Sequence, residues 1–224
     1  MATEHLASYD VSSWRRSRAW LRDLTLSSQV CWALTAIFAV ALVYYHWRYE
    51  GWLQTIVFAG AITASLFSLL LLISRRALFS IVLIALLVAT IVMAADVKRH
   101  YIEMVLHAYD VVFYLTSWST LVFLWADHKL MLLALAGMAA LAAGSGLLLW
   151  QIDGTRVRRS VSSLLLVFCI GLAAVASYAK GERRNTSFFW DNQYLAPFYP
   201  SWTETISTLL RGQLMGAVKV QPFP

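Results

Sequence analysis

Charged side chains are scarce in this sequence: they make up 13% of its 224 residues, whereas 60% of the residues are hydrophobic. The mean hydropathy is correspondingly high, at +0.64. Such a chain has too little polar surface to coat a water-soluble globule, which argues against most soluble classes of protein. The sequence therefore predicts an integral membrane protein.

The formal net charge of +6 does not indicate a nucleic-acid-binding protein. The basic residues lie at the ends of apolar runs and in short loops, whereas a nucleic-acid surface gathers them along one face. We expect membrane phospholipid, in particular anionic phospholipid, as the partner of these charges, and no nucleic acid.

Cysteine and catalytic motifs are also scarce. Cys31 and Cys169 both fall inside apolar runs, where a thiol usually serves as a small packing group rather than in a disulfide. The GxSxG, P-loop, CxxC and HExxH motifs are absent, so we predict no catalytic residue, no metal ligand and no cofactor in this chain. Residues 1–26 are polar, and no cleavage site follows the first apolar run, so we expect that run to remain as an anchor.

Five apolar runs are each long enough for a helix to cross the hydrocarbon core of a bilayer, which takes about 20 residues. They cover residues 28–45, 52–73, 77–95, 130–150 and 161–178. The predicted fold is an all-α polytopic membrane protein with three parts: a cytoplasmic segment (1–27), a five-span membrane domain (28–178) and an extracytoplasmic linker (179–224). The second and third spans are expected to form a tight antiparallel hairpin, because residues 74–76 alone separate them.

The distribution of lysine and arginine predicts the orientation, because basic residues in short loops resist translocation. With the N-terminus inside, the cytoplasmic side holds nine arginines: Arg15, Arg16, Arg18, Arg22, Arg75, Arg76, Arg156, Arg158 and Arg159. The outer loops then hold four basic residues: Arg48, Lys98, Arg99 and Lys129. The tail reduces this bias without reversing it, through Lys180, Arg183 and Arg184. We expect a bacterial-type inner (plasma) membrane, with the N-terminus cytoplasmic and the C-terminus extracytoplasmic.

Residues 99–127 are expected to lie along the outer surface. The apolar stretch within them, 111–125, carries no charge, but it is short for a span and another span begins soon after it. Counting it as a sixth span would place Arg156, Arg158 and Arg159 outside, against the charge distribution. We therefore predict an interfacial or re-entrant helix here.

The polar tail contains a further predicted helix. Pro197 and Pro200 are expected to end any helix before Ser201, which forms a capping-box pattern with Glu204. The helix that follows is predicted to be an amphipathic linker, with apolar side chains on one face: Ile206, Leu209, Leu210 and Leu214.

Two of the spans carry small residues four positions apart, which let helix backbones approach closely in lipid. The two sets are Gly60, Ala64 and Ser68, and Ala136, Ala140 and Gly144. We interpret both sets as packing within one bundle, with a dimer face as the alternative.

The candidate binding residues lie between the third and fourth spans: Lys98, Arg99, His100, Tyr109 and Asp110. Lysine and arginine bind phosphate by charge-assisted hydrogen bonds, and tyrosine sits at headgroup level in membranes. We expect Lys98 and Arg99 to hold a lipid phosphate, and the other three residues to orient the headgroup. The alternative is that all five are ordinary interface anchors.

The histidines do not indicate a metal or haem site. His100 and His107 are seven residues apart, which on a helix is about 10 Å, so one ion cannot easily take both. A membrane haem needs histidines that face each other from different spans. The histidines in question lie outside the predicted spans: His46, His100, His107 and His128.

Two segments carry a family resemblance: residues 98–101 (KRHY) with Tyr109 and Asp110, and the aromatic tail from residues 188–190 (FFW) to 199–202 (YPSW). With the five-span layout, the chain resembles the N-terminal membrane domain of lipoteichoic acid synthase-like phosphoglycerol transferases and related membrane-anchored sulfatase-superfamily enzymes. The resemblance implies an extracytoplasmic alkaline-phosphatase-like domain after the spans. In that family this domain holds the nucleophile and a divalent metal, and its residues are absent from this chain.

The resulting prediction is a membrane anchor and lipid-presenting domain of a phosphoglycerol-transferase or sulfatase-like enzyme. The expected lipid partner is anionic phospholipid. By the resemblance, the chain is either a truncated or split form of such an enzyme, or a membrane module whose partner is a catalytic domain encoded separately. Two alternatives remain open: a stand-alone transporter or channel subunit, and a structural assembly partner. A transporter usually needs ionisable groups within its spans, whereas the predicted spans contain Gln54, threonine and serine but no charge.

Overall fold

The computed structural model describes residues 26–116, 118–181 and 194–210, and their regular secondary structure is entirely α-helical. The helices are α2 (Ser28–Glu50), α3 (Leu53–Ser74), α4 (Ala77–Ile102), α5 (Ala108–Thr116), α6 (Trp118–Ile152), α7 (Arg159–Gly181) and α8 (Leu195–Leu210). Five of them, α2, α3, α4, α6 and α7, are long and apolar enough to cross a membrane. The predicted all-α, multi-pass membrane fold is confirmed. The predictions for residues 1–25, 182–193 and 211–224 lie outside the described residues.

The first candidate span is longer than the sequence predicted. The helix α2 continues to Glu50, so it contains His46, and the prediction that His46 lies outside the spans is wrong. The helix continues because no proline or glycine interrupts it before Gly51, which ends it with a positive φ of 67°. His46 and Glu50 are both buried, with 3% and 0% of their surfaces exposed.

The helices α3 and α4 form the predicted antiparallel hairpin through Arg75 and Arg76. Arg75 has a left-handed backbone conformation (φ 59°), and its N–H donates to the Leu71 carbonyl at 2.8 Å. This bond satisfies a carbonyl at the end of α3 and reverses the chain within two residues.

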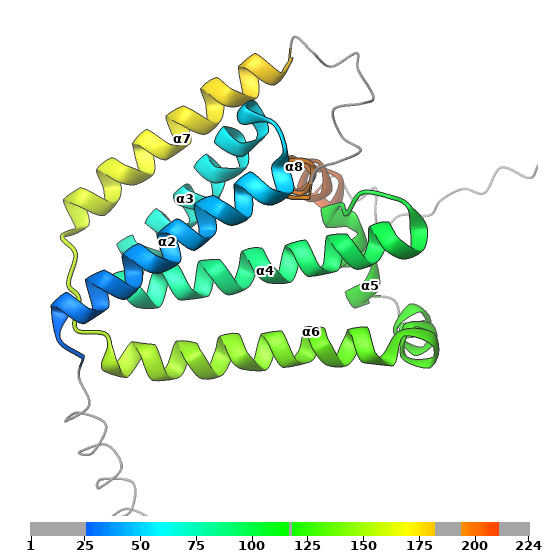
Figure 1. The fold of residues 1–224 in the computed structure, drawn as a ribbon. Helices are drawn as coiled ribbons and strands as arrows, with labels where there is room; N and C mark the ends of the chain where they lie inside the picture. The colour runs from blue at the N-terminus through cyan, green and yellow to red at the C-terminus, as the bar shows by residue number, and fades with distance from the viewer. Residues whose placement is uncertain (1–25, 117, 182–193, 211–224) are drawn as a thin grey trace, which may run out of the picture.

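The spanning helices pack unevenly. Figure 1 shows α2, α3 and α4 packed together, with α7 against α3 and α6 along α4. The helix α6 contacts only α4 and α5 among the described helices, so most of its apolar surface faces away from the chain. We call the end of the bundle where α8 lies the α8 end, and the opposite end, with residues 75–76 and 153–158, the arginine end.

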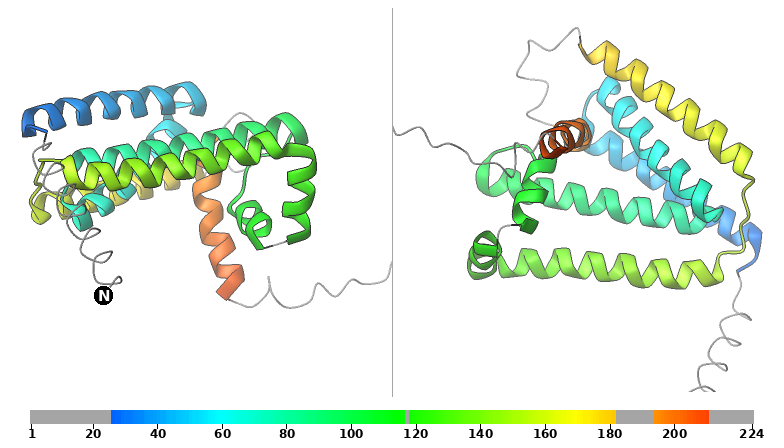
Figure 2. Two further views of the ribbon diagram at one scale, coloured as in Figure 1. Left: turned by 90° about the horizontal axis from the view of Figure 1, so that it is seen from below. Right: turned by 180° about the vertical axis from the view of Figure 1, so that it is seen from behind.

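The segment predicted to be interfacial lies at the α8 end. It comprises the end of α4, a loop at residues 103–107, α5 and the first turns of α6. Figure 2 shows these first turns lying across the direction of the rest of α6. The membrane-spanning part of α6 begins at Leu132.

The two sets of small residues behave differently. On α3, Ser68 is buried and its hydroxyl donates to the Ala64 carbonyl at 2.7 Å, while Gly60 and Ala64 are half-buried. On α6, Ala136, Ala140 and Gly144 are exposed. A side chain added at Gly144 would meet no atom within 4 Å.

The C-terminal helix begins earlier than predicted, at Leu195 instead of Ser201. Pro197 lies in its first turn, where a missing N–H removes no helical bond, and Pro200 is accommodated inside the helix. The predicted capping box is wrong, because the Ser201 hydroxyl accepts the N–H of Ala108, at the start of α5, at 2.8 Å.

The face of α8 that packs on the bundle also differs from the prediction. Its buried apolar side chains include Leu195, Phe198 and Tyr199, which belong to the largest hydrophobic cluster of the described residues. Ile206 and Leu210, which we predicted on the apolar face, are exposed, and Leu214 lies outside the described residues.

Candidate functional site

The start of α8 is held by a carboxylate that lies 145 residues earlier in the sequence. Glu50, the last residue of α2, accepts the N–H of Leu195 at 2.6 Å and that of Ala196 at 3.2 Å. The first N–H groups of a helix have no partner within the helix, and its dipole favours a negative charge there. Glu50 therefore acts as a buried cap that fixes α8 across the bundle.

A chain of polar side chains beneath α8 supplies a second attachment. The Tyr199 hydroxyl lies 2.9 Å from the Thr63 hydroxyl, which lies 3.0 Å from Nε2 of His46. The other ring nitrogen of His46 lies 2.7 Å from the Leu42 carbonyl, so it must be the donor. The Thr63 hydroxyl also donates to the Ala59 carbonyl at 2.9 Å, so the three side chains form one connected polar group beneath α8.

Tyr199 stays protonated under physiological conditions. Burial raises the pKa of its hydroxyl from 10.0 to about 12. A raised pKa in the folded state means that the proton stabilises the docked helix below pH 10, and that this contribution is lost as the pH rises towards 12. The contribution of Tyr199 to the attachment of α8 is therefore expected not to change with pH in the physiological range.

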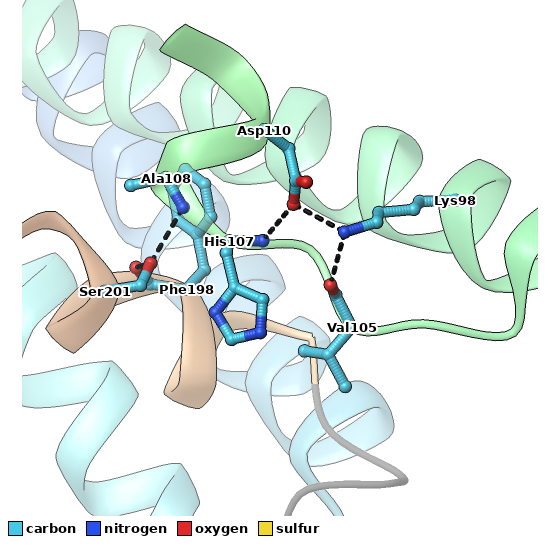
Figure 3. Close-up of polar contacts among 7 residues, drawn as sticks. All are labelled: Lys98, Val105, His107, Ala108, Asp110, Phe198 and Ser201. Atoms are coloured by element: carbon cyan, nitrogen blue, oxygen red, sulfur yellow. Dashed lines mark hydrogen bonds and ion pairs between the residues drawn. The ribbon is translucent and has the colours of Figure 1, made fainter. Parts of the chain in front are cut away.

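The loop after α4 is fastened by an ion pair, shown in Figure 3. The Lys98 ammonium donates to Asp110 at 2.5 Å and to the Val105 carbonyl at 2.8 Å. The same carboxylate accepts the N–H of His107 at 2.7 Å, which caps the start of α5. The Lys98 and Asp110 side chains are only 11% and 20% exposed. Lys98 and Asp110 therefore fix the path of residues 103–107 to each other and to α5.

We expect Lys98→Met to destabilise the protein by about 1–2 kcal/mol, between the values for exposed and buried pairs. The loss arises because Asp110 keeps its burial but loses its cation. Unfolding of the purified protein, measured for Lys98→Met, Asp110→Asn and the double variant, gives the coupling energy. Additive losses would contradict a direct interaction between the two side chains.

A cavity of about 260 Å³ opens beside this loop. Its lining comes from the end of α4, the loop and the residue before α8: Ala95, Arg99, Glu103, Met104, Val105, Leu106 and Tyr194. Glu103 ends α4 in a left-handed conformation (φ 57°), and its N–H donates to the Arg99 carbonyl at 3.0 Å. This reversal folds the loop back so that it forms one wall of the cavity.

Arg99 and Tyr194 form the polar part of this cavity. The guanidinium carbon of Arg99 lies 5.6 Å from the centroid of the Tyr194 ring, within cation–π range. The Tyr194 hydroxyl donates to Asp96 at 3.2 Å. Burial and the neighbouring Asp96 raise the pKa of Tyr194, so its hydroxyl remains a donor. The cavity thus combines the guanidinium of Arg99, the protonated hydroxyl of Tyr194 and the carboxyl group of Glu103.

The five predicted binding residues do not converge on one site. Arg99 lines the cavity, whereas Lys98 and Asp110 pair with each other beside it. His100 is exposed on α4, and Tyr109 is 46% exposed and stacks on Phe113 with ring centroids 6.0 Å apart. The structure thus separates one cavity residue from two loop-fixing residues and two surface residues.

Three residues of this region were missed from sequence: Glu50, Glu103 and Tyr194. For Glu103 the sequence did offer a signal, because it is an acidic residue three positions after the basic residues 98–100. Glu50 and Tyr194 carried no local signal, because their partners lie far away in the chain. Long-range packing therefore decided which residues form the site.

The described residues contain no group of three or more histidine, cysteine, aspartate or glutamate side chains that could hold a metal ion. The fold and this region together define a multi-pass α-helical membrane protein with a cavity, lined by Arg99 and Glu103 among others, at one end of the bundle. Comparison with protein-family models, curated proteins and solved structures finds no match to this chain. The family resemblance drawn from the sequence stays a prediction.

Proposed function

We propose that this protein binds the headgroup of an anionic phospholipid in the cavity at the α8 end. The observation that carries the proposal is the position of Arg99, on the cavity wall and against the Tyr194 ring. A guanidinium donates two parallel hydrogen bonds to a phosphate, and the Tyr194 ring holds that of Arg99 at the cavity wall. Glu103, on the same wall, is suited to accept hydrogen bonds from the hydroxyl groups of a glycerol headgroup.

Lys98 and Asp110 have a positioning role in this proposal. Their ion pair fixes the loop that forms one wall of the cavity, so they shape the site without contacting the phosphate. His100 and Tyr109 anchor the surrounding surface at headgroup level, as exposed basic and aromatic residues do at membrane interfaces.

The wider role that we propose is that of a membrane anchor and lipid-presenting domain of a phosphoglycerol-transferase or sulfatase-like enzyme. The catalytic residues and any divalent metal then belong to a separate domain or chain. The arginine end faces the cytoplasm of a bacterial-type plasma membrane in this proposal, because it carries Arg75, Arg76, Arg156, Arg158 and Arg159. The α8 end, with the cavity, then faces outwards, where such a catalytic domain works.

We expect Arg99→Gln to weaken phosphatidylglycerol binding about tenfold, which is the effect of losing one charge-assisted contact. Native mass spectrometry of the purified protein in a neutral detergent, titrated with phosphatidylglycerol, measures this change. The matched control is Arg48→Gln, which removes the same charge at the same end but does not line the cavity. Equal affinity of the Arg99→Gln variant and the control would overturn the role of the cavity.

For the transporter alternative, the structure adds two buried ionisable residues within a candidate span, but it adds no path across the membrane. His46 and Glu50 lie within a candidate span, which the sequence prediction had left without charge. Both are engaged in attaching α8: Glu50 caps its start, and His46 contacts Tyr199 through Thr63. These contacts explain their burial, so we favour the lipid-presenting role.

A further inference from the structure

The arginine end carries a cluster of arginines around the loop of residues 153–158, and hydrogen bonds fix this loop to the start of α4. Asp153 follows α6 and accepts the N–H of Phe79 at 2.9 Å, while its other oxygen accepts the N–H and hydroxyl of Thr155 at 2.8 and 2.7 Å. The Thr155 hydroxyl accepts the N–H of Ala77 at 2.7 Å. The loop therefore caps the start of α4, and both oxygens of the Asp153 carboxylate are used in doing so.

Three arginines are oriented by the carbonyl groups of this loop. Arg75 donates to Val157 at 3.4 Å, Arg76 to Asp153 at 3.4 Å, and Arg156 to the adjacent Thr155 at 3.0 Å. A guanidinium has five N–H donors, so each side chain is positioned while most of its donors remain for other contacts. Within the described part of the chain, none of the three forms an ion pair with a carboxylate.

Two of these guanidinium groups, those of Arg76 and Arg156, are held by carbonyl groups two residues apart on the same loop, Asp153 and Thr155. Arg76 is half-buried, and its guanidinium carbon lies 4.9 Å from the centroid of the Trp150 ring. Burial and then the nearby charge of Arg156 lower the pKa of Arg76, and Asp153 opposes them only in part. Like charges that a fold holds close together are stabilised by an anion between or beside them.

The surroundings of the cluster indicate what kind of anion fits. Trp150 is 48% exposed and packs edge-on against Phe79, with ring centroids 5.3 Å apart. Tryptophan is typical of the level of lipid headgroups. Below it, Leu147, which lies three residues before Trp150 and so on the same face of α6, exposes apolar surface. The helix α6 has few partners in the described part of this chain. A lipid can contact both the arginines and this apolar surface, whereas a free anion can contact only the arginines.

We propose that Arg76 and Arg156, with Arg75 beside them, bind the phosphate of an anionic membrane lipid, whose acyl chains lie along α6 below Trp150. The ligand chemistry is a phosphate with a net negative charge. The site lies at the opposite end of the bundle from the cavity of Arg99, so it does not depend on the proposed function of that cavity.

The test is carried out in the Arg99→Gln background, so that the cavity at the α8 end cannot account for the result. The full chain in a neutral detergent is titrated with phosphatidylglycerol, phosphatidylcholine or inorganic phosphate and measured by native mass spectrometry. We expect Arg76→Gln with Arg156→Gln to weaken phosphatidylglycerol binding at least tenfold, because two charge-assisted contacts are lost. The matched control, Arg48→Gln with Lys129→Gln, removes the same charge elsewhere and should change binding less than twofold.

A variant with a single substitution distinguishes a loss of lipid binding from a loss of folding. Arg156 donates only to the neighbouring Thr155 carbonyl, so Arg156→Gln breaks no contact between helices and should still weaken binding several-fold. Unchanged binding in this variant and in the double variant would overturn the proposal. Equal binding of phosphatidylcholine would overturn the preference for an anionic lipid, and competition by inorganic phosphate at the same concentration as the lipid would overturn the assignment to a lipid.

Discussion

Glu50→Ala is expected to release α8 from the bundle. The substitution leaves the N–H groups of Leu195 and Ala196 without the acceptor that they have at 2.6 and 3.2 Å. It also removes a negative charge from the start of a helix and leaves a void where a fully buried side chain stood. Together these losses amount to about 2–4 kcal/mol, which exceeds what the neighbouring Tyr199 hydrogen bond contributes.

Release of α8 can be followed at Thr205, which is 5% exposed on the buried side of the helix. A Thr205→Cys reporter should react slowly with a water-soluble thiol reagent in the parent protein and much faster when combined with Glu50→Ala. Arg48→Ala, two positions before Glu50 in the same helix but exposed, is the matched control and should leave the reaction slow. Unchanged labelling in the Glu50→Ala variant would show that the carboxylate does not hold α8.

Gly154→Ala is expected to be the most damaging small substitution at the arginine end. A β-carbon at this position would lie 2.6 Å from the backbone carbonyl oxygen of Leu26, well inside van der Waals contact. The Leu26 segment cannot easily move away, because its N–H donates to the Ile152 carbonyl at 3.1 Å. Forcing the two segments apart also disturbs Asp153 and the cap on α4, so we expect a loss of about 2–3 kcal/mol.

Thermal unfolding of the purified protein in detergent measures this loss. The matched control is Gly144→Ala, because an added β-carbon there meets no atom within 4 Å. In a helix interior that change is expected to be neutral or slightly stabilising, since alanine has the higher helix propensity. A Gly154→Ala variant as stable as Gly144→Ala would contradict the close approach of Leu26 to this loop.

The spans were predictable because their signal is local. A bilayer fixes how many apolar residues a crossing helix needs, and the five runs meet that requirement independently of their partners. The ends of the helices were less predictable. Polar residues such as His46 and Glu50 resemble a loop in the sequence. In the fold their partners are tertiary: His46 contacts Thr63 of α3, and Glu50 accepts from the start of α8.

The helix α8 illustrates the limit of local rules. Ser201 and Glu204 have the spacing of a capping box, yet the cap is provided by Glu50, which is 145 residues away from Leu195. Ser201 is used instead to satisfy the start of α5. The local pattern was outweighed by tertiary contacts, which sequence periodicity does not report.

The sequence drew attention to the segment after α4, but it did not show that Arg99 lines a cavity while Lys98 pairs with Asp110. Lys98 and Arg99 are adjacent on a helix, so their side chains leave it about 100° apart and cannot both face one cavity. Which of them faces the cavity depends on how the chain turns at Glu103. That turn places Asp110 beside Lys98 and leaves Arg99 on the cavity wall.

The most direct test of the headgroup site is photocrosslinking with a phosphatidylglycerol analogue that carries a photoreactive group on its headgroup. Mass spectrometric mapping is expected to place labels within residues 95–106 or at Tyr194, and Arg99→Gln should remove these labels. Labels at the arginine end are expected to persist in that variant. An absence of label from residues 95–106 and Tyr194 in the parent protein would contradict headgroup binding in the cavity at the α8 end.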